Sequence, residues 1–452
     1  MKKIFILLTC WLFFVLFCWP KEVGLKEDAS LKLSLNEAQE YAIENNYEAM
    51  NSQLDISSAE KQIWETISAG FPQVSGSVSY KDNLKLATQL VPGDVFGGEA
   101  GSYTELVMGT KHNATLSLSA SQMIFDSSFF LGLKTAKIYL DMSEENFKKT
   151  ELDIRATVAE TYTTILTAEE NQRILEETLE NTKRTHYETS ELFKEGFAEE
   201  TDVDQLQISV TSLESDLNAI KRQISTSYLL LKYQLGVDLN RSVILTDGLE
   251  SILDQIDLNR LITQEFDIED NINYKLAETQ EQLSRFSLKT EKAGYFPSLN
   301  LVAGYQRDAM RDEFNFFSSE QKWYLNYYIG LELDWSLFSG TSRAQKIAQA
   351  KIALEQAKNT KKQTVEQLIL EVEQAKNNLI SYYETYQNSI KNMALAEKVY
   401  HRTAEKYKEG ICSNLELIEA HDQYLAEQST YIQAILDLLN GKITLDKLLE
   451  NA

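Results

Sequence analysis

The sequence is poor in proline and glycine, with 4 prolines and 18 glycines among 452 residues. Both residues interrupt helices, because proline lacks a backbone N–H group and glycine loses much conformational entropy when it is fixed. One long stretch, from Thr341 to Glu409, contains neither of them. This scarcity disfavours a protein of many short strands and predicts long helices.

Cysteine is also scarce, and two of the three cysteines, Cys10 and Cys18, lie in the first twenty residues. Cys412 remains alone, which excludes an internal disulfide and a cysteine-based metal cluster. The four histidines are scattered, and none has a cysteine or second histidine at ligand spacing. The sequence also lacks a G-x-S-x-G motif and a phosphate loop. We therefore expect no metal, no cofactor and no enzymatic activity, and we interpret Cys412 as an incidental thiol in an exposed turn.

Basic residues are outnumbered, with 44 lysines and arginines against 68 acidic residues and a formal net charge of −24. A nucleic-acid-binding protein would carry a basic surface, so the charge argues against that class. An acidic chain of this kind is soluble and self-repelling, and its surfaces or channels attract cations.

The first residues differ in composition from the rest of the chain. Lys2 and Lys3 precede an apolar run, Ile4 to Phe17, that is too short to span a bilayer comfortably. We interpret residues 1–20 as an export signal with an unclear cleavage site, since no A-x-A tripeptide follows. Cys18 is a second candidate feature, a lipid-attachment site, although bulky Phe17 precedes it where a small residue is expected. No other apolar run reaches the length of about 18 residues that a spanning helix needs.

The chain repeats itself. "AGFPQVSGSVSY" (Ala69 to Tyr80) resembles "AGYFPSLNLVAGY" (Ala293 to Tyr305), which places Pro72 and Pro297 at equivalent positions (297 − 72 = 225). Each proline ends a helical pattern and begins an alternating one, as proline favours extended structure in its neighbour. The sequence therefore predicts two similar halves, each with a helix-to-strand junction.

Each junction is followed by strand-like alternation, clearest in Asn113–Phe125 and Tyr327–Phe338. In the second segment one face is apolar and the other carries Glu332 and Asp334. Ten such residues edged by aromatics fit a membrane β-strand with lipid on one face and water on the other. A half-buried strand of a soluble sheet gives the same alternation. Trp323, Tyr324 and Trp335 are correspondingly either interface aromatics or sheet core. The glycine-rich segment after Tyr80 is expected to form a flexible loop.

A very long helix follows each strand pair. Apolar and small residues recur at spacings of three and four, and the two series are related by a shift of 214 positions. Both series are typical of coiled-coil seams. A helix from Thr341 to Lys408 would be about 100 Å long. The second series runs through Leu368, Val372, Ala375, Leu379, Tyr382, Tyr386, Ser389, Met393, Ala396, Tyr400, Thr403 and Tyr407.

Both long helices end in a similar motif, "KEGFAEETDVDQL" from Lys194 and "KEGICSNLELIEA" from Lys408. Gly196 and Gly410 are again related by the same shift (410 − 196 = 214), and glycine permits a left-handed helix end. Thr201, or Ser413 with Asn414, is expected to cap the next helix. Each half thus folds back as a helical hairpin with a glycine at its tip. The predicted units are a signal, 1–20; repeat one, 31–245, with strands at about 72–125 and a hairpin at about 128–235; and repeat two, 246–452, with strands at about 297–338 and a hairpin at about 341–440.

From "SLNEAQEYAIENN" (Ser34 to Asn46) to the C-terminus, the chain resembles the TolC-like outer-membrane efflux proteins. The resemblance rests on this opening helix, on the paired "FP" junctions, on the strand-to-helix turns "IFDSS" and "LFSGT", and on the paired "KEG" tips. Each motif is weak by itself, but the junctions, the turns and the tips each occur twice and in the same order.

The resemblance implies a mainly α fold with membrane β-structure, in which each subunit of a homotrimer gives four strands to a 12-stranded barrel. Long helices would form a periplasmic tunnel, surrounded by a belt built from the region after Leu235, the stretch between the repeats and the C-terminus. The implied role is a passive exit duct in the outer membrane of a Gram-negative bacterium. It would dock on a periplasmic adaptor and an inner-membrane transporter. Independently, four strands are too few to close a barrel, and open edges are not tolerated in lipid.

Matched to the family, Asp202, Glu416 and Glu419 fall on positions of acidic rings at the periplasmic mouth. In the alternative interpretation, these acids lie on a solvated helix face near an N-terminus, where acidic residues are common. The tip residues Gly196, Phe197, Gly410 and Ile411 would contact the adaptor, unless Phe197 and Ile411 only cap the coiled coil. Glu332 and Asp334 would line the barrel. Cys412 stands where some members carry a basic residue that holds the mouth closed, and Lys406 or Lys408 is its candidate substitute.

A protein of another class would share several of these features. A periplasmic coiled-coil adaptor without a pore has long helical hairpins, but it carries a lipoyl-like β-domain inserted between them and has no membrane strands. The uninterrupted helices leave no room for that insertion, and the alternating segments favour the pore. The sequence does not identify the transported substrate.

Overall fold

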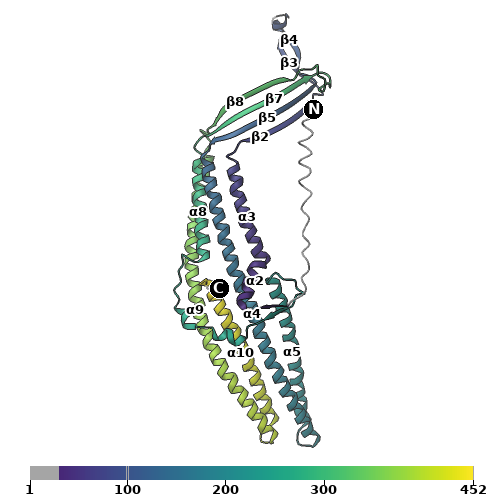
Figure 1. The fold of residues 1–452 in the computed structure, drawn as a ribbon, viewed down its shortest axis with the longest axis vertical. Helices are drawn as coiled ribbons and strands as arrows, with labels where there is room; N and C mark the ends of the chain where they lie inside the picture. Colours follow the sequence, from purple (N-terminus) through teal and green to yellow (C-terminus); the bar gives the residue numbers. More distant parts are fainter. Residues whose placement is uncertain (1–29, 98, 100, 451–452) are drawn as a thin grey trace.

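The computed structural model describes residues 30–450 except residues 98 and 100. The expected signal peptide and the possible lipidation at Cys18 lie outside these described residues. A β-sheet occupies one end of the molecule, and long helices run from it to the other end (Figure 1). Within the described part of the chain, no helix combines the length and apolarity that crossing a membrane requires.

The sheet has four antiparallel strands in the order β2-β5-β7-β8. Their bounds are Gln73–Asp82 for β2, His112–Phe125 for β5, Ser298–Arg311 for β7 and Tyr324–Asp334 for β8. Strand β8 begins and ends earlier than the predicted strand Tyr327–Phe338. Trp335 and Leu337 continue the alternation of apolar and polar residues, but they lie beyond the last paired residue, Asp334. Strands β2 and β8 each have one partner, so the sheet has two open edges.

The register gives the sheet one polar and one apolar face. Directly paired residues point to the same face, and successive residues alternate. Ser75 pairs with Ser119 and Ser77 with Ser117, with 2.7 Å between the hydroxyl oxygens of each pair. On the same face lie Asn300 and Gln306 of β7 and, from β8, Glu332. The opposite face is mainly apolar, although Arg307 and Gln122 also lie on it; its apolar residues are Val74, Val78, Leu116, Leu118, Leu299, Leu301, Ile329, Leu331 and Leu333.

The segment after Tyr80, expected to be a flexible loop, is a second, smaller hairpin. Strands β3 (Ala87–Pro92) and β4 (Tyr103–Met108) pair antiparallel, with a short 3₁₀ helix, Gly93–Phe96, after β3. This arm projects beyond the four-stranded sheet (Figure 1). Sequence reasoning missed this hairpin because its apolar residues, such as Leu90 and Val107, are exposed. Neither strand has a buried face, so the sequence shows no regular alternation of apolar and polar residues.

Four helices connect to the ends of the strands at the lower side of the sheet. Helix α3 (Tyr47–Ser68) leads into β2, α4 (Ser127–Lys194) follows β5, α8 (Ile272–Ala293) leads into β7, and α9 (Ser342–Lys408) follows β8. Contacts join α3 to α4, α4 to α8, and α8 to α9, which repeats the order of the strands above them. The two longest helices match the predicted runs, and every predicted seam residue of α9 listed above is at least half-buried.

A belt of short elements packs against the middle of α4 and α9. It contains β1 (Leu31–Leu33), which pairs in parallel with β6 (Val243–Leu245), and the helices α2 (Leu35–Asn45), α6 (Leu249–Asp254) and α7 (Leu258–Thr263). The largest hydrophobic cluster lies here and includes Tyr162. The Tyr162 hydroxyl donates to the carbonyl oxygen of Leu33 at 3.1 Å and lies 3.2 Å from a carboxylate oxygen of Asp247. Burial, above all, raises the pKa of Tyr162 to about 12.

The returning helices are α5 (Glu200–Gln234) and α10 (Asn414–Leu448). Helix α10 extends past the expected end near residue 440, because Gly441 lies inside it. A Cβ atom at Gly441 would lie 2.7 Å from the Tyr382 ring of α9, so glycine here allows close packing rather than a turn. Each hairpin connection is only a few residues long, so the adaptor alternative with an inserted β-domain is wrong.

Candidate functional site at the hairpin tips

Both hairpins end in the same turn geometry. Gly196 and Gly410 have φ angles of +81° and +70°, which L-residues with side chains rarely adopt. The amide of Phe197 donates to the carbonyl of Leu192, and that of Ile411 to the carbonyl of Lys406, each at 2.8 Å. These bonds form the Schellman ends of the long helices. No atom lies within 4 Å of a Cβ built at either glycine, so the backbone angle alone selects glycine.

Two of the predicted acids act in helix capping. Glu199 is the N-cap of α5, and its amide donates to the Asp202 carboxylate at 3.1 Å, so the expected Thr201 cap is wrong. In α10, Ser413 is the N-cap as expected, and its hydroxyl accepts from the Glu416 amide at 3.3 Å. Asp202 and Glu416 are equivalent in the repeat (416 − 202 = 214) and hold the third position of their helices. Their carboxylates therefore also satisfy the positive helix starts.

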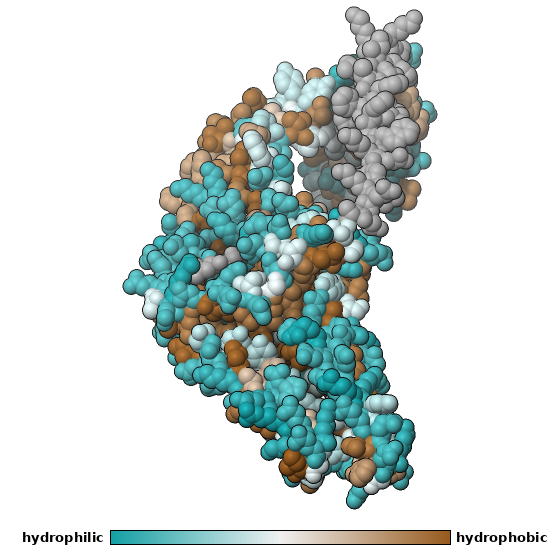
Figure 2. Space-filling view, turned by 60° about the horizontal axis from the view of Figure 1, so that its bottom comes forward, coloured by the Kyte–Doolittle hydropathy of each residue, from teal (hydrophilic) through white to brown (hydrophobic). Residues whose placement is uncertain are grey.

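The tips present apolar side chains to solvent. Phe197 is 82% exposed and Ile411 is 67% exposed. A cleft of about 960 Å³ lies between the tips, lined by both glycine turns and by Tyr407, Asp202 and Asn414 among others. Figure 2 brings this end forward and shows apolar patches among mainly hydrophilic residues. Exposed apolar residues beside a cleft are typical of protein docking sites.

Two polar contacts connect the hairpins at this end. The Lys408 ammonium of α9 lies 2.8 Å from a carboxylate oxygen of Glu188 on α4. The Asn414 side-chain amide of α10 donates to the side-chain oxygen of Gln205 on α5 at 2.9 Å. Asn414 is buried, so this contact is shielded from solvent. Sequence reasoning named Lys408 only as a possible substitute lock; the spacing along one helix gave no sign of its partner on α4.

Cys412 is less exposed than expected. It is half-buried, and its thiol donates to the Thr403 carbonyl at 3.4 Å. Burial, reinforced by the Glu416 carboxylate, raises the pKa of the Cys412 thiol. The thiol is therefore protonated at neutral pH and poorly reactive.

The remaining predicted residues divide between the tips and the sheet. Glu416 and Glu419 are exposed, whereas Asp202 is half-buried. Glu332 and Asp334 lie on the polar face of the sheet, opposite Asn300 and Ser298 in the register. The acids of the tips and those of the sheet therefore lie at opposite ends of the long helices (Figure 1). Pro72 and Pro297 each precede a strand, immediately before β2 and β7.

Above the tips, the two hairpins meet through a polar seam. Helix α4 contributes four buried threonines, whose spacing of three or four residues places them on one face. Facing them, His421 of α10 is 5% exposed and its Nε2 lies 3.1 Å from the Thr182 hydroxyl. Tyr400 of α9 stacks on Tyr424 of α10, with 5.8 Å between ring centroids. The four threonines are Thr178, Thr182, Thr185 and Thr189.

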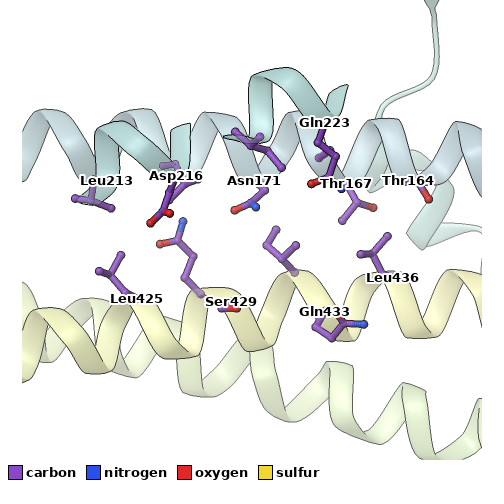
Figure 3. A pocket seen from close by; sticks show the side chains of 15 residues that line it. Thr164, Thr167, Asn171, Leu213, Asp216, Gln223, Leu425, Ser429, Gln433 and Leu436 are labelled. Atoms are coloured by element: carbon purple, nitrogen blue, oxygen red, sulfur yellow. The ribbon is translucent and has the colours of Figure 1, made fainter. Parts of the chain in front are cut away.

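A groove separates α5 from α10 higher up. It has a volume of about 400 Å³, with α4 as its floor. Figure 3 shows Leu213 and Asp216 of α5 on one side and Leu425 and Ser429 of α10 on the other. Gln428, which also lines it, is 2% exposed, and neither atom of its side-chain amide has a hydrogen-bond partner. Hydrogen bonds join the hairpins near their tips, whereas a gap with an unsatisfied amide separates them here.

Comparison with known proteins now identifies the chain. The family model described as outer membrane efflux protein matches residues 39–237 and 271–451. The chain belongs to the outer membrane efflux protein family. The chain is therefore placed in the outer membrane, with its helical part in the periplasm. The two matched segments correspond to the two repeats found in the sequence, and the TolC-like resemblance is confirmed.

Individual relatives are distant. The chain is 22% identical over 288 residues to the "Proteases secretion protein PrtF" of Dickeya chrysanthemi, covering 63% of this chain. It is 20% identical over 272 residues to the "Outer membrane protein TolC" of Vibrio cholerae, covering 58% of this chain. The matches span 61% and 59% of those two proteins, less than two thirds of their length.

Solved structures confirm the fold. The chain superimposes on CusC, described in work on "conformational changes accompanying folding and transmembrane channel formation", with a TM-score of 0.72. The match covers 95% of this chain and 96% of that chain at 17% sequence identity. The predicted mainly α fold with long helical hairpins and four membrane strands is thus the fold of this family.

Proposed function

We propose that this chain is the outer-membrane exit duct of a tripartite efflux system or a type I secretion system. It provides a passive path from the periplasm to the cell exterior, and the energy comes from an inner-membrane transporter. The proposal rests on how the parts of the chain are arranged. A sheet with one apolar and one polar face lies at one end of two helices of 67 and 68 residues, and exposed apolar side chains lie at the tips at the other end.

The sheet requires more than one copy of the chain. Strands β2 and β8 each leave a row of backbone groups unpaired, and such edges are not tolerated in lipid. Pairing β2 of one copy with β8 of the next removes every edge when the ring closes. A homotrimer gives 12 strands, within the range of bacterial barrels, whereas one copy gives four.

In that barrel the apolar face contacts lipid and the polar face lines the water-filled lumen. The serine ladder between β2 and β5 supports this assignment, because its hydroxyls satisfy one another and suit a wet surface. Glu332 and Asp334 then face the lumen. A carboxylate on the lipid side would be destabilising, to a degree that depends on its depth in the membrane.

At the other end, Asp202, Glu416 and Glu419 form the acidic mouth of the tunnel, and Phe197 and Ile411 are the anchors for a periplasmic adaptor. The exposure of the two apolar side chains and the cleft between the tips support this role. Three-fold symmetry turns each exposed carboxylate into a ring of three, which favours cations. Gly196 and Gly410 shape the tips that the adaptor contacts.

The test combines assembly with conductance. Purified protein in detergent should run as a trimer on gel electrophoresis without heating and as a monomer after boiling. The same preparation should form water-filled channels in planar lipid bilayers. A water-soluble monomer that never inserts into bilayers would refute the proposal. A trimer that forms no conducting channel would refute the role as an exit duct but would leave the trimeric assembly supported.

A further inference from the structure

The upper tunnel carries a group of lysines that the exit-duct role leaves unexplained. Lys134 and Lys137 of α4 and Lys289 and Lys292 of α8 are all exposed. We call these four residues the basic collar. Helices α4 and α8 are in contact, and their ends beneath the sheet are joined because the Ser127 hydroxyl donates to the Ala293 carbonyl at 2.8 Å. At 1.5 Å per residue, all four lysines lie within about 15 Å of that junction.

The collar is a locally basic region of a chain that is acidic overall. Residues 127–140 contain no acidic side chain, and α8 has only Glu291 in its last two turns. The chain as a whole has a formal net charge of −24. The lysines therefore create a local positive potential immediately below the sheet.

The collar lysines also lack ionic partners. Farther down the helices, lysines pair with carboxylates of neighbouring helices, as Lys183 does with Glu214 and Lys221 with Glu176. Throughout the described residues, none of the four collar lysines takes part in an ion pair, and Lys289 instead lies 4.4 Å from the centre of the Phe286 ring. Exposed lysines without a carboxylate partner keep their full charge available to an anionic ligand.

Exposed aromatic residues mark the membrane boundary at the same height. Trp64 of α3 is 62% exposed although it lies within the last turns of a helix that water would surround. Tyr295, Phe296 and Trp335, at the junction itself, are also exposed. Tryptophan and tyrosine concentrate at the headgroup level of membranes, and lysine stems extend toward that level from below.

The collar faces away from the tunnel interior. Lys137 precedes Tyr162 by 25 residues, close to seven complete turns, so both lie on the same side of α4. Tyr162 is covered by the belt, which encloses the helices from outside. The side of α4 that carries Lys137 therefore points outward, toward the membrane surface that surrounds the tunnel.

We propose that the basic collar binds the headgroups of anionic glycerophospholipids in the periplasmic leaflet of the outer membrane. The sheet above it inserts its apolar face into the lipid, the aromatic residues lie at the interface, and the lysines contact phosphate groups just beneath. This contact selects lipid by charge and also fixes the depth at which the sheet stops.

The test compares lipids by native mass spectrometry. Delipidated full-length protein is incubated with an equimolar mixture of phosphatidylglycerol and phosphatidylethanolamine, and the bound lipids are counted. We expect phosphatidylglycerol to be enriched about fivefold or more, and the enrichment to fall as salt rises. The variant Lys134→Gln, Lys137→Gln, Lys289→Gln, Lys292→Gln should bind both lipids nearly equally.

Two matched variants complete the design. A control with Lys149→Gln, Arg222→Gln, Lys391→Gln and Lys398→Gln removes the same charge at exposed positions away from the junction and should keep the enrichment. Replacing the four collar lysines by arginine should also keep it. Equal binding of the two lipids by the unaltered protein, or equal loss in the control, overturns the proposal. If the glutamine variant fails to assemble, the proposal is tested by the arginine variant, which should keep the phosphatidylglycerol enrichment, and by the fall of this enrichment in the unaltered protein as salt rises. Channel conductance is independent of all these outcomes, so failure of the collar leaves the exit duct standing.

Discussion

Lys408, the last residue of α9, pairs with Glu188 on α4 at 2.8 Å, whereas its repeat equivalent Lys194 pairs with Glu191 on its own helix. One member of this equivalent pair therefore ties the two hairpins together, and the other does not. The contact lies beside the tip cleft, where separation of the hairpins would widen the mouth. Lys408 supplies a basic residue at the site although Cys412 occupies the position expected to hold one.

Replacing Lys408 by methionine should loosen the mouth. Spin labels at Glu195→Cys and Glu409→Cys, in a Cys412→Ser background, report the distance between the tips by pulsed electron paramagnetic resonance. We expect the population with separated tips to rise about two- to fivefold, because a partly exposed ion pair contributes about 0.5–1 kcal/mol. Lys194→Met is the matched control and should leave the distance distribution unchanged. Equal behaviour of the two variants would show that the pair does not hold the hairpins.

The packing of His421 should make the closed hairpins sensitive to acid. Burial lowers the pKa of His421, opposed by the adjacent Asp422 carboxylate. The neutral ring is therefore favoured where Thr182 and Tyr400 enclose it, and the proton binds more readily when the hairpins separate. The closed state keeps its full stability above the ordinary histidine pKa of about 6.5, and loses it progressively as pH falls below that value.

Planar bilayer recordings between pH 7.5 and 5 would measure this effect as a rise in open probability on acidification. His421→Gln retains a donor for the Thr182 contact but cannot titrate, so its open probability should vary little with pH. His401→Gln is the control, since His401 is exposed and lies 3.9 Å from Glu397 on its own helix. A pH response that survives in His421→Gln and disappears in His401→Gln would refute this role.

The tip glycine should resist substitution for a conformational reason. Gly410→Ala forces a side chain into the left-handed region at a cost of about 1–2 kcal/mol, although no atom obstructs it. We expect faster cleavage by trypsin after Lys406 and Lys408, without loss of the overall fold. Gly132→Ala, in an open position within α4, should instead stabilise the protein by up to about 1 kcal/mol. If both variants behaved alike in thermal unfolding and proteolysis, the tip argument would fail.

Neutralising the proposed mouth acids should alter ion selectivity. Glu416→Gln combined with Glu419→Gln should lower the preference for cations and weaken block by divalent cations in planar bilayers. Glu405→Gln, at an exposed position of α9, is the control for the loss of one nearby negative charge. Unchanged selectivity in the double variant would remove Glu416 and Glu419 from the lumen.

The long elements of the fold could be predicted because their signals are local and repeated. The seam of α9 was visible in residues such as Leu368 and Leu379, and Gly196 and Gly410 marked both turns. The alternation in β5 reflected its two faces. Errors occurred where tertiary packing decides the outcome, as at Gly441, which interrupts no helix because the Tyr382 ring needs its missing side chain.

The candidate site was predictable only in part. The positions of Asp202 and Glu416 followed from the repeat, but their capping bonds depend on where each helix begins. The Lys408–Glu188 and Asn414–Gln205 contacts join residues more than 200 positions apart. No periodicity within one helix shows how two hairpins are turned toward each other. The partners of His421 were hidden for the same reason.

The difference between Lys194 and Lys408 has a consequence for recognition. Internal duplication would make the two tips of each chain interchangeable, but one tip carries the lysine of the ion pair and the other lies beside its partner Glu188. A trimeric mouth would then present the two kinds of tip in alternation. A ring-shaped partner would bind a surface with threefold rather than sixfold symmetry. Each of its subunits would then contact one of two different tip surfaces.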